Sequence, residues 1–302
     1  MATQDIRATA RRAESPPADP SRYRTLLVSL LLVVLLALVW EGAKALAAAV
    51  DYSLMIGDTP VDLTLFNDTQ LPHLGDIFAS FGEPAQRNGA PLYQMLIESG
   101  LYTLWAALRG FLIGGVIGFG LAILFAHSGL LQRGLLPYVV ASQTVPILAI
   151  APMIVIWMGR MGAVDWSVPV IAAYLTFFPV TIYTLRGLTS VPPTALELMQ
   201  TYAASRREIL FKLRLPNALP QIFTALKISA TASVVGAIIG ELPSGIQSGL
   251  GIAILNFSRY YNQSPPRLWA TILASGLLGI LFFAVIALIE RLVVRWKAEV
   301  SD

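Results

Sequence analysis

The stretch Pro192-Pro-Thr-Ala-Leu-Glu-Leu-Met-Gln-Thr-Tyr-Ala-Ala-Ser-Arg-Arg-Glu-Ile-Leu-Phe-Lys-Leu-Arg-Leu-Pro-Asn-Ala-Leu-Pro220 is a polar interval between two strongly apolar ones. Its charges are concentrated within nine residues: Arg206, Arg207, Glu208, Lys212 and Arg214. A charge at the centre of a bilayer costs roughly 2.5–3.5 kcal/mol. The stretch is therefore predicted to lie outside a membrane that the flanking apolar runs cross.

Two short helices are predicted within this polar interval, over 194–203 and 205–213. Two residue pairs have the Ser/Thr-x-x-Glu spacing of a capping box: Thr194 with Glu197, and Ser205 with Glu208. Because proline disrupts a helix interior, Pro216 and Pro220 are expected to restart the chain into the next apolar run. The interval thus reads as a pair of short helices outside the membrane.

The composition indicates an integral membrane protein. Of 302 residues, 56% are hydrophobic and only 13% are charged, whereas soluble domains carry about 25% charged residues. A net charge of +3 gives no sign of a nucleic-acid partner. The absence of cysteine excludes disulfides and thiol catalysis, and the two histidines, His73 and His127, do not form a clustered metal site.

The apolar runs predict an all-α integral membrane fold. Six transmembrane helices are expected, at about 26–49, 101–126, 135–158, 166–185, 221–241 and 268–290. The corresponding domains are a tail at 1–25, a first transmembrane helix at 26–50, a loop at 51–100, a core of five helices at 101–293 that includes 192–220, and a tail at 294–302. The loop is expected to be mostly irregular, with a helix starting near Pro91.

The distribution of basic residues predicts the orientation. The segment from Arg186 to Leu219 holds five basic and two acidic residues, whereas the loop 51–100 holds one arginine and seven acids. Because basic loops remain in the cytoplasm, both termini and the polar interval are placed on the cytoplasmic side. The chain is expected to be a multi-pass membrane protein with both ends in the cytoplasm.

Polar side chains within the apolar runs are candidates for lining a solute pathway: Gln143, Thr144, Ser233 and Glu241. The first two precede Pro146, and a broken helix at depth needs polar partners or water. The alternative for Ser and Thr is a bond to a carbonyl of their own helix. The alternatives for Glu241 are pairing with Arg109 or Lys227, lining an outer gate, or a place among headgroups. A re-entrant piece is expected at Gly249–Phe257.

The polar interval also carries a resemblance to a known family. Glu197-Leu-Met, three residues, Ala203, nine residues, Leu213-Arg-Leu-Pro216 resembles the EAA loop of ABC importer permeases, which reads Glu-Ala-Ala, three residues, Gly, nine residues, Ile-x-Leu-Pro. The spacing matches without gaps. Ala203 replaces the glycine of the pattern, and glycine reaches positive φ more easily than alanine.

Two further segments, Ser142–Gly159 and Val235–Glu241, are similar to the nitrate/sulfonate/taurine branch of these permeases, which includes riboflavin and thiamine-related pyrimidine importers. The resemblance covers most of residues 95–295. It implies a type I ABC importer permease with cytoplasmic coupling helices. The implied substrate is a small organic solute or anion: a pyrimidine or thiamine precursor, riboflavin, a sulfonate, taurine or nitrate.

The resemblance also implies partners. These are two cytoplasmic ABC ATPase subunits, a second permease subunit in a homodimer or heterodimer, and an extracytoplasmic substrate-binding protein. The residues expected to contact the ATPase are Glu197, Met199, Tyr202, Ala203, Ser205, Arg206, Leu215 and Pro216. The chain has no Gly-x-x-x-x-Gly-Lys-Ser/Thr loop, so ATP and Mg²⁺ are expected on the ATPase, with no cofactor in this chain.

The residues argue against two other functions. A membrane-embedded enzyme needs a convergent set of catalytic groups, and the sequence contains neither His-x-x-Glu-His nor Gly-x-Ser-x-Gly. A stand-alone secondary transporter would be favoured by internal repeats or by several charges at mid-membrane depth. Neither feature is found, so a non-catalytic transport subunit is the favoured prediction.

Overall fold

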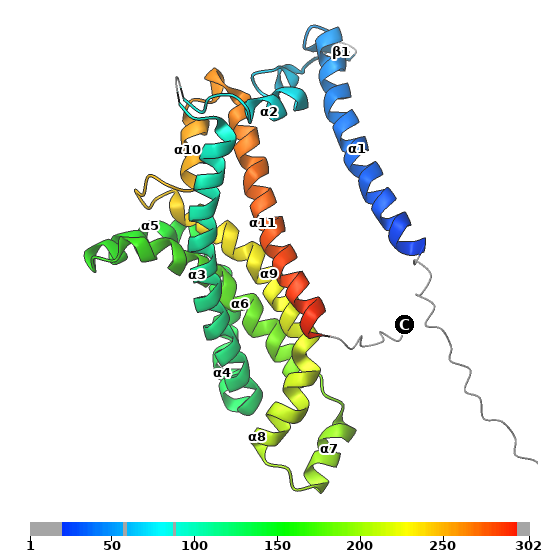
Figure 1. The fold of residues 1–302 in the computed structure, drawn as a ribbon, viewed down its shortest axis with the longest axis vertical. Coiled ribbons are helices and arrows are strands. Elements are labelled where there is room, and N and C mark those ends of the chain that lie inside the picture. The colour runs from blue at the N-terminus through cyan, green and yellow to red at the C-terminus, as the bar shows by residue number, and fades with distance from the viewer. Residues whose placement is uncertain (1–19, 57–58, 87–88, 295–302) are drawn as a thin grey trace, which may run out of the picture. The chain divides into compact units, whose positions relative to one another are not determined.

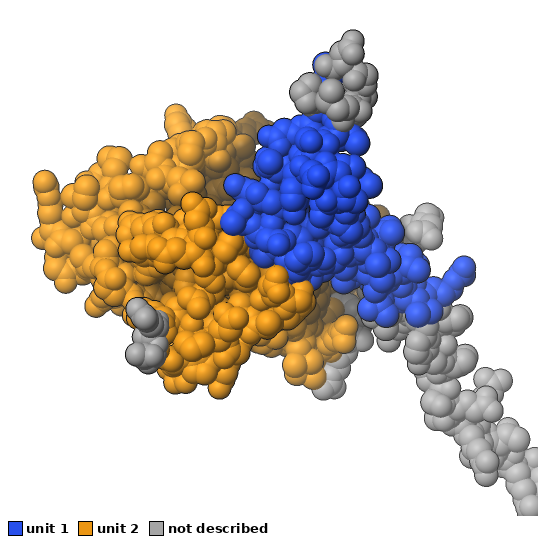
Figure 2. Space-filling model, turned by 90° about the horizontal axis from the view of Figure 1, so that it is seen from above, with its two compact units in different colours: residues 1–74 blue, residues 75–302 orange. Residues whose placement is uncertain are grey.

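The structure is a computed structural model that describes residues 20–56, 59–86 and 89–294. The chain divides into two compact units, residues 1–74 and residues 75–302 (Figure 2). The predictions for the tail residues 1–19 and 295–302 lie outside the described residues. Within the described part, the fold is mainly helical, as the apolar runs predict.

The first unit holds one long helix and a small ordered loop. Its elements are α1 (Pro20–Ala49), the antiparallel strands β1 (Ser53–Ile56) and β2 (Thr59–Asp62), and the 3₁₀ turn η1 (Thr64–Phe66). The long helix begins at Pro20, inside the segment 1–25 that was predicted as a tail preceding the first helix. The strand pair was also missed, because its four-residue strands are too short to show a clear alternating pattern.

Lys44 orders the loop that follows the strands. Its side chain is only 2% exposed, and its Nζ donates hydrogen bonds to Asp68 Oδ1 at 2.8 Å, to the Phe66 carbonyl at 3.3 Å and to the Leu71 carbonyl. Because a buried ammonium needs partners for all three of its protons, the loop wraps around it. The loop from Asn67 to His73 has no helix or strand, as expected, and its hydrogen bonds to Lys44 hold it in place.

The second unit is a bundle of long helices (Figure 1). In chain order the elements are α2 (Leu74–Ser80, starting at the boundary), α3 (Leu92–His127), α4 (Gly129–Ser142), α5 (Ile147–Arg160), η2 (Val164–Trp166), α6 (Ser167–Thr189), α7 (Pro193–Thr201), α8 (Arg206–Glu208), η3 (Ile209–Arg214), α9 (Leu215–Glu241), α10 (Leu250–Arg259), η4 (Tyr261–Gln263) and α11 (Pro265–Val293). The helix expected from about Pro91 begins at Leu92.

Helix α6 packs between α3 and α9 and forms the centre of the bundle. The approach to α3 is close because glycines face α6: a Cβ at Gly114 would lie 2.5 Å from the Ala173 carbonyl oxygen. On the other side, a Cβ at Gly236 would lie 2.8 Å from Ala172 Cα. Without a strong hydrophobic drive between helices in lipid, such close backbone packing is a main source of association.

The third predicted span, 135–158, is broken at Pro146 into two helices. Helices α4 and α5 meet at 96° across residues 143–146. Pro146 lacks an N–H, and the hydroxyl of Thr144 donates to the Ala141 carbonyl at 2.7 Å, so the ladder ends there. Among the described residues, five helices are long and apolar enough to cross a membrane, or six if the bent pair counts as one span.

Candidate functional site

The polar interval folds into a compact loop at one end of the second unit, which we call the α7–α8 loop (residues 192–216) (Figure 1). Its first helix, α7, starts at Pro193, and Pro192 occupies the N-cap position without a side-chain hydrogen bond. The capping box predicted at Thr194 is wrong, since the helix starts one residue earlier. The fixed φ of proline suits the first helical position, so Pro193 takes it and Thr194 lies inside the first turn.

Ala203 makes the turn between the two helical parts. Its φ is +52°, in the left-handed region. The N–H of Ala203 donates to the Gln200 carbonyl at 2.8 Å, and the N–H of Ala204 donates to the Met199 carbonyl at 3.0 Å. These two bonds form a Schellman motif, the helix ending in which glycine is the usual left-handed residue. Alanine thus adopts the conformation that the EAA pattern gives to glycine.

The capping box predicted at Ser205 is present. The Ser205 hydroxyl accepts a hydrogen bond from the Glu208 N–H at 3.3 Å, and Glu208 Oε2 accepts one from the Ser205 N–H at 2.9 Å. Lys212 Nζ lies 2.9 Å from the other Glu208 carboxylate oxygen. The hydrogen bond from Ser205 and the ion pair with Lys212 fix the start of the second helical part.

The second predicted helix, 205–213, does not end where expected. Helix α8, the π-helical segment η3 and α9 run on as one helix from Arg206 to Glu241. The Leu215 N–H donates to the Leu210 carbonyl, which is the i−5 pairing of a π-helix. This wider turn comes directly before Pro216, which has no N–H to pair, so the helix continues through the proline.

The α7–α8 loop exposes large apolar side chains. Tyr202 is 78% exposed, Phe211 65% and Leu198 58%. Phe211 is not among the coupling residues predicted from the sequence, although an aromatic residue next to Lys212 in a polar segment is a usable signal. Of the predicted coupling residues, Glu197, Tyr202, Ala203, Ser205 and Arg206 are exposed, and Met199, Leu215 and Pro216 are half-buried.

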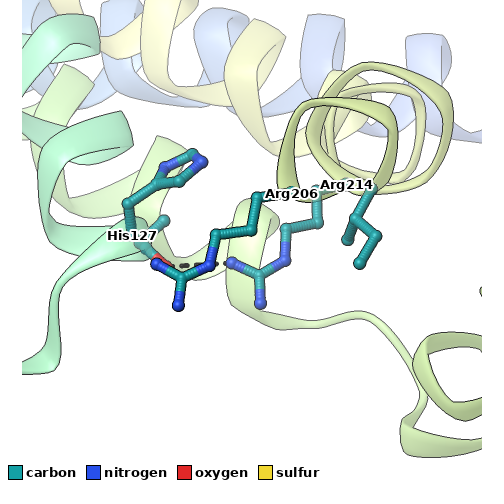
Figure 3. Close-up of a pocket in the computed structure, with 5 residues that line it drawn as sticks. His127, Arg206 and Arg214 are labelled. Carbon is teal, nitrogen blue, oxygen red and sulfur yellow. Dashed lines mark hydrogen bonds between the residues drawn. The ribbon is translucent and has the colours of Figure 1, made fainter. Parts of the chain in front are cut away.

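A pocket of about 170 Å³ lies between this loop and the end of α3 (Figure 3). Its lining residues are Ala126, His127, Arg206, Ile209 and Arg214. Arg214 Nη1 donates a 2.9 Å hydrogen bond to the Ala126 carbonyl, which is one of the unpaired carbonyls near the end of α3. The bond connects the helix that follows the loop to a second long helix of the bundle.

The four pathway candidates fall into two groups. Gln143 and Thr144 are exposed at the bend between α4 and α5. Ser233 and Glu241 are fully buried, and neither lines an open surface of the subunit in this structure. Ser233 donates to the Ala230 carbonyl at 2.8 Å, and Thr144 donates to the Ala141 carbonyl at 2.7 Å, so both hydroxyls bond to a nearby carbonyl of their own segment.

Glu241 pairs with neither Arg109 nor Lys227. Its Oε1 accepts from Thr103 Oγ1 at 2.8 Å, and its Oε2 accepts from the Gly251 N–H at 2.7 Å. Lys227 instead pairs with Glu290 at 2.7 Å. Arg109 lies 5.7 Å and 5.3 Å from the rings of two tryptophans, Trp105 and Trp166.

The segment expected to be re-entrant, Gly249–Phe257, is largely helical, as the first part of α10. It begins after Gly249, whose φ is +111°. Among the described residues, no group of three or more His, Cys, Asp or Glu side chains is placed to hold a metal ion.

Comparison with known proteins identifies the family. The pattern of the family described as "Binding-protein-dependent transport system inner membrane component" matches residues 114–295, more than half of the chain. The formylaminopyrimidine transport permease protein ThiX of Halalkalibacterium halodurans is 35% identical over 190 residues, which cover 63% of this chain and 74% of that protein. The riboflavin transport system permease protein RibX of Chloroflexus aurantiacus is 33% identical over 205 residues, 68% of this chain and 74% of that protein.

The fold agrees with this assignment. The crystal structure of an amino acid ABC transporter with histidines superposes with a TM-score of 0.54 at 17% identity, covering 66% of this chain and 94% of that one. At this identity the likeness concerns the fold alone. With the matched sequence pattern, the apolar helices and the shared permease fold, the chain belongs to the binding-protein-dependent family of ABC transporter permeases, multi-pass proteins of the inner membrane.

Proposed function

We propose that this ABC importer permease forms half of a solute pathway and is driven by cytoplasmic ATPases that dock on the α7–α8 loop. The proposed assembly has a second permease subunit, two ATPases and an extracytoplasmic substrate-binding protein. The chain itself is non-catalytic in this proposal, with ATP and Mg²⁺ held by the ATPases. Its termini and the α7–α8 loop then face the cytoplasm, in agreement with the distribution of basic residues.

The observation that carries the docking proposal is the exposed apolar surface of the α7–α8 loop. Leu198 lies on α7, Tyr202 directly follows α7, and Phe211 lies near the start of the Arg206–Glu241 helix; each is more than half exposed. Apolar helix faces of this kind bind in grooves of partner proteins, and large aromatic side chains supply much of the energy of such interfaces. Glu197 and Arg206 at the rim would act mainly on orientation and specificity.

The α7–α8 loop is connected to three long helices of the bundle. The continuous helix from Arg206 to Glu241 leads from the loop along the bundle. Arg214 holds the end of α3 through the Ala126 carbonyl, and Asn217 Nδ2 donates to Ser190 Oγ at 3.1 Å, just beyond the end of α6. A displacement of the loop by an ATPase would therefore act on the ends of three long helices together.

The docking proposal is tested by co-purification. The full-length chain is co-expressed with its ATPase as wild type and as Tyr202→Ala, Glu197→Ala and Arg206→Glu, and bound ATPase is quantified. The matched control is Tyr260→Ala, because Tyr260 is 63% exposed and directly follows α10, which lies at the opposite end of the bundle from α7 and α8 (Figure 1). We expect the loop variants to lose ATPase and the control to retain it. Full retention by all three loop variants would contradict the docking assignment.

For the substrate, we propose a small organic solute of the pyrimidine (thiamine precursor) or riboflavin kind. This rests on the names of the two relatives compared above. Sulfonates, taurine and nitrate are the alternatives within the same branch. A ligand screen on the cognate binding protein, followed by uptake of the ligand it selects, tests the proposal. Selective binding of an inorganic anion would contradict it.

Within the pathway, we propose that Gln143 and Thr144 contact the solute, because they are exposed at the bend where the α4–α5 backbone is broken. Replacement of Gln143 by leucine should lower uptake while leaving ATPase association intact. A stand-alone transporter is the alternative function. Uptake that persists in cells without the ATPase would favour it.

A further inference from the structure

The pocket between the end of α3 and the start of the Arg206–Glu241 helix is lined by basic side chains from separate parts of the chain. Arg206 and Arg214 extend their guanidinium groups to the same side, and His127 lies beside them (Figure 3). The remaining lining residues are Ala126 and Ile209. The pocket thus has two permanent positive charges and no carboxylate among its lining residues.

The hydrogen-bonding capacity of the two arginines is largely unused. Arg214 donates one hydrogen bond, to the Ala126 carbonyl, and its Nε is buried without a partner among the described residues. Arg206 forms no ion pair with any described residue. The nearest acid along the helix, Glu208, is occupied by Ser205 and Lys212. Because two guanidinium groups in one pocket repel each other, an anion between them would be strongly favoured.

The position of the pocket indicates where such an anion comes from. The apolar run of α3 ends at Ala126, and the apolar run of α9 begins at Leu215, directly after Arg214. The pocket therefore lies where two membrane helices leave the hydrocarbon, at the depth of the lipid headgroups. The apolar docking surface of the α7–α8 loop is a separate set of side chains, including Leu198 and Tyr202, none of which lines the pocket.

We propose that this pocket binds a phosphate group presented by an anionic phospholipid. The planar guanidinium forks of Arg206 and Arg214 match the oxygen pairs of a phosphodiester, and charge-assisted bonds of this type are the strong ones. Basic pockets between membrane helices bind lipid headgroups in this way. A bound lipid would bridge the start of the Arg206–Glu241 helix and the end of α3, and the inference does not depend on ATPase docking.

The test measures lipid binding directly. The full-length chain is purified in detergent without its ATPase and titrated with phosphatidylglycerol, with phosphatidylcholine, and with inorganic phosphate, and bound species are counted by native mass spectrometry. The variants are Arg206→Gln and Arg214→Gln. The matched control is Arg207→Gln, which removes the same charge one residue away at a position that does not line the pocket. Thermal unfolding verifies that each variant is folded.

We expect phosphatidylglycerol to bind saturably and more tightly than phosphatidylcholine. Arg206→Gln should weaken this binding about tenfold, which corresponds to the loss of one charge-assisted contact, and Arg207→Gln should change it little. Equal binding of the two lipids, or equal effects of the Arg206 and Arg207 substitutions, would overturn the proposal. Binding of inorganic phosphate that displaces the lipid fully would overturn the lipid source and leave a site for free anions. Because no ATPase is present, these outcomes are independent of the docking test.

Discussion

Glu241 at the end of α9 and Thr103 in α3, 138 positions apart in the chain, are joined by a hydrogen bond of 2.8 Å. The second carboxylate oxygen of Glu241 accepts the Gly251 N–H at 2.7 Å, and Thr103 Oγ1 accepts the Leu250 N–H at 2.9 Å. These bonds tie the first turn of α10 to two long helices. Position 249, next to these bonds, requires glycine, because a Cβ there would lie 2.3 Å from the Glu241 carboxyl carbon.

Thr103→Val should loosen α10. Valine keeps the shape of threonine but removes the hydroxyl, so Glu241 loses a donor and the Leu250 N–H loses its acceptor. Leaving buried groups without partners costs about 1–3 kcal/mol. We expect a lower midpoint of thermal unfolding in detergent and faster hydrogen exchange at the amides of α10.

Thr184→Val is the matched control. Thr184 is also fully buried, in α6, but its hydroxyl has no hydrogen-bond partner among the described residues. Removing an unpaired hydroxyl should leave stability unchanged or raise it. If the two substitutions lower the unfolding midpoint equally, the hydrogen bonds of Thr103 do not hold α10.

Substitution of two neighbouring glycines of α3 by alanine should affect stability very differently. A Cβ at Gly114 would lie 2.5 Å from the Ala173 carbonyl oxygen and 2.7 Å from Thr176 Cβ, so Gly114→Ala should force α3 and α6 apart at a cost of about 1–3 kcal/mol. A Cβ at Gly115 meets nothing within 4 Å, so Gly115→Ala should be neutral. Thermal unfolding of the two variants distinguishes them, and equal destabilisation would contradict the packing.

Local sequence patterns predicted the features that depend on neighbouring residues. The Ser205–Glu208 capping box was predicted because both of its bonds close within one helical turn. The gapless spacing from Glu197 to Pro216 predicted the family, which the comparisons confirm. Long apolar runs predicted the helical membrane fold, since only a helix satisfies its own backbone in lipid.

Features that depend on distant partners were not predictable from such patterns. The sequence offered Arg109 and Lys227 as partners for Glu241, but the structure pairs Glu241 with Thr103, whose neighbours give no charge signal. The bond from Arg214 to the Ala126 carbonyl spans 88 positions and involves a backbone atom, which no residue type marks. The α4–α5 bend was indicated by its prolines, but its angle of 96° depends on packing against other helices.

The loop around Lys44 should loosen in acid. The hydrogen bond from Lys44 holds the pKa of Asp68 below its ordinary value. Because the folded-state pKa is lowered, the resulting stabilisation is present above the ordinary pKa of Asp and is lost as the pH falls through the lowered value. Asp68→Asn should therefore lower the unfolding midpoint at pH 7, and the difference from wild type should vanish in strong acid.

A Lys44→Met background verifies that this effect belongs to the ion pair. Without the ammonium, Asp68 has lost its main partner, so Asp68→Asn should no longer change the unfolding midpoint at pH 7. A full effect of Asp68→Asn in that background would assign the stabilisation to another contact, of which His73 Nε2 at 3.3 Å is the nearest one observed.

Ala203→Gly should stabilise the turn of the α7–α8 loop. Ala203 has a φ of +52°, and a left-handed conformation costs an L-residue with a Cβ roughly 1–2 kcal/mol that glycine avoids. The greater freedom of glycine in the unfolded chain offsets part of this gain. We therefore expect a net stabilisation of about 1 kcal/mol, or roughly fivefold slower hydrogen exchange in α7. The control is Ala204→Gly, at a position without positive φ, where added freedom should only speed exchange. Faster exchange in both variants would show that the left-handed turn is not strained, and that alanine serves this loop as well as the glycine of the family pattern.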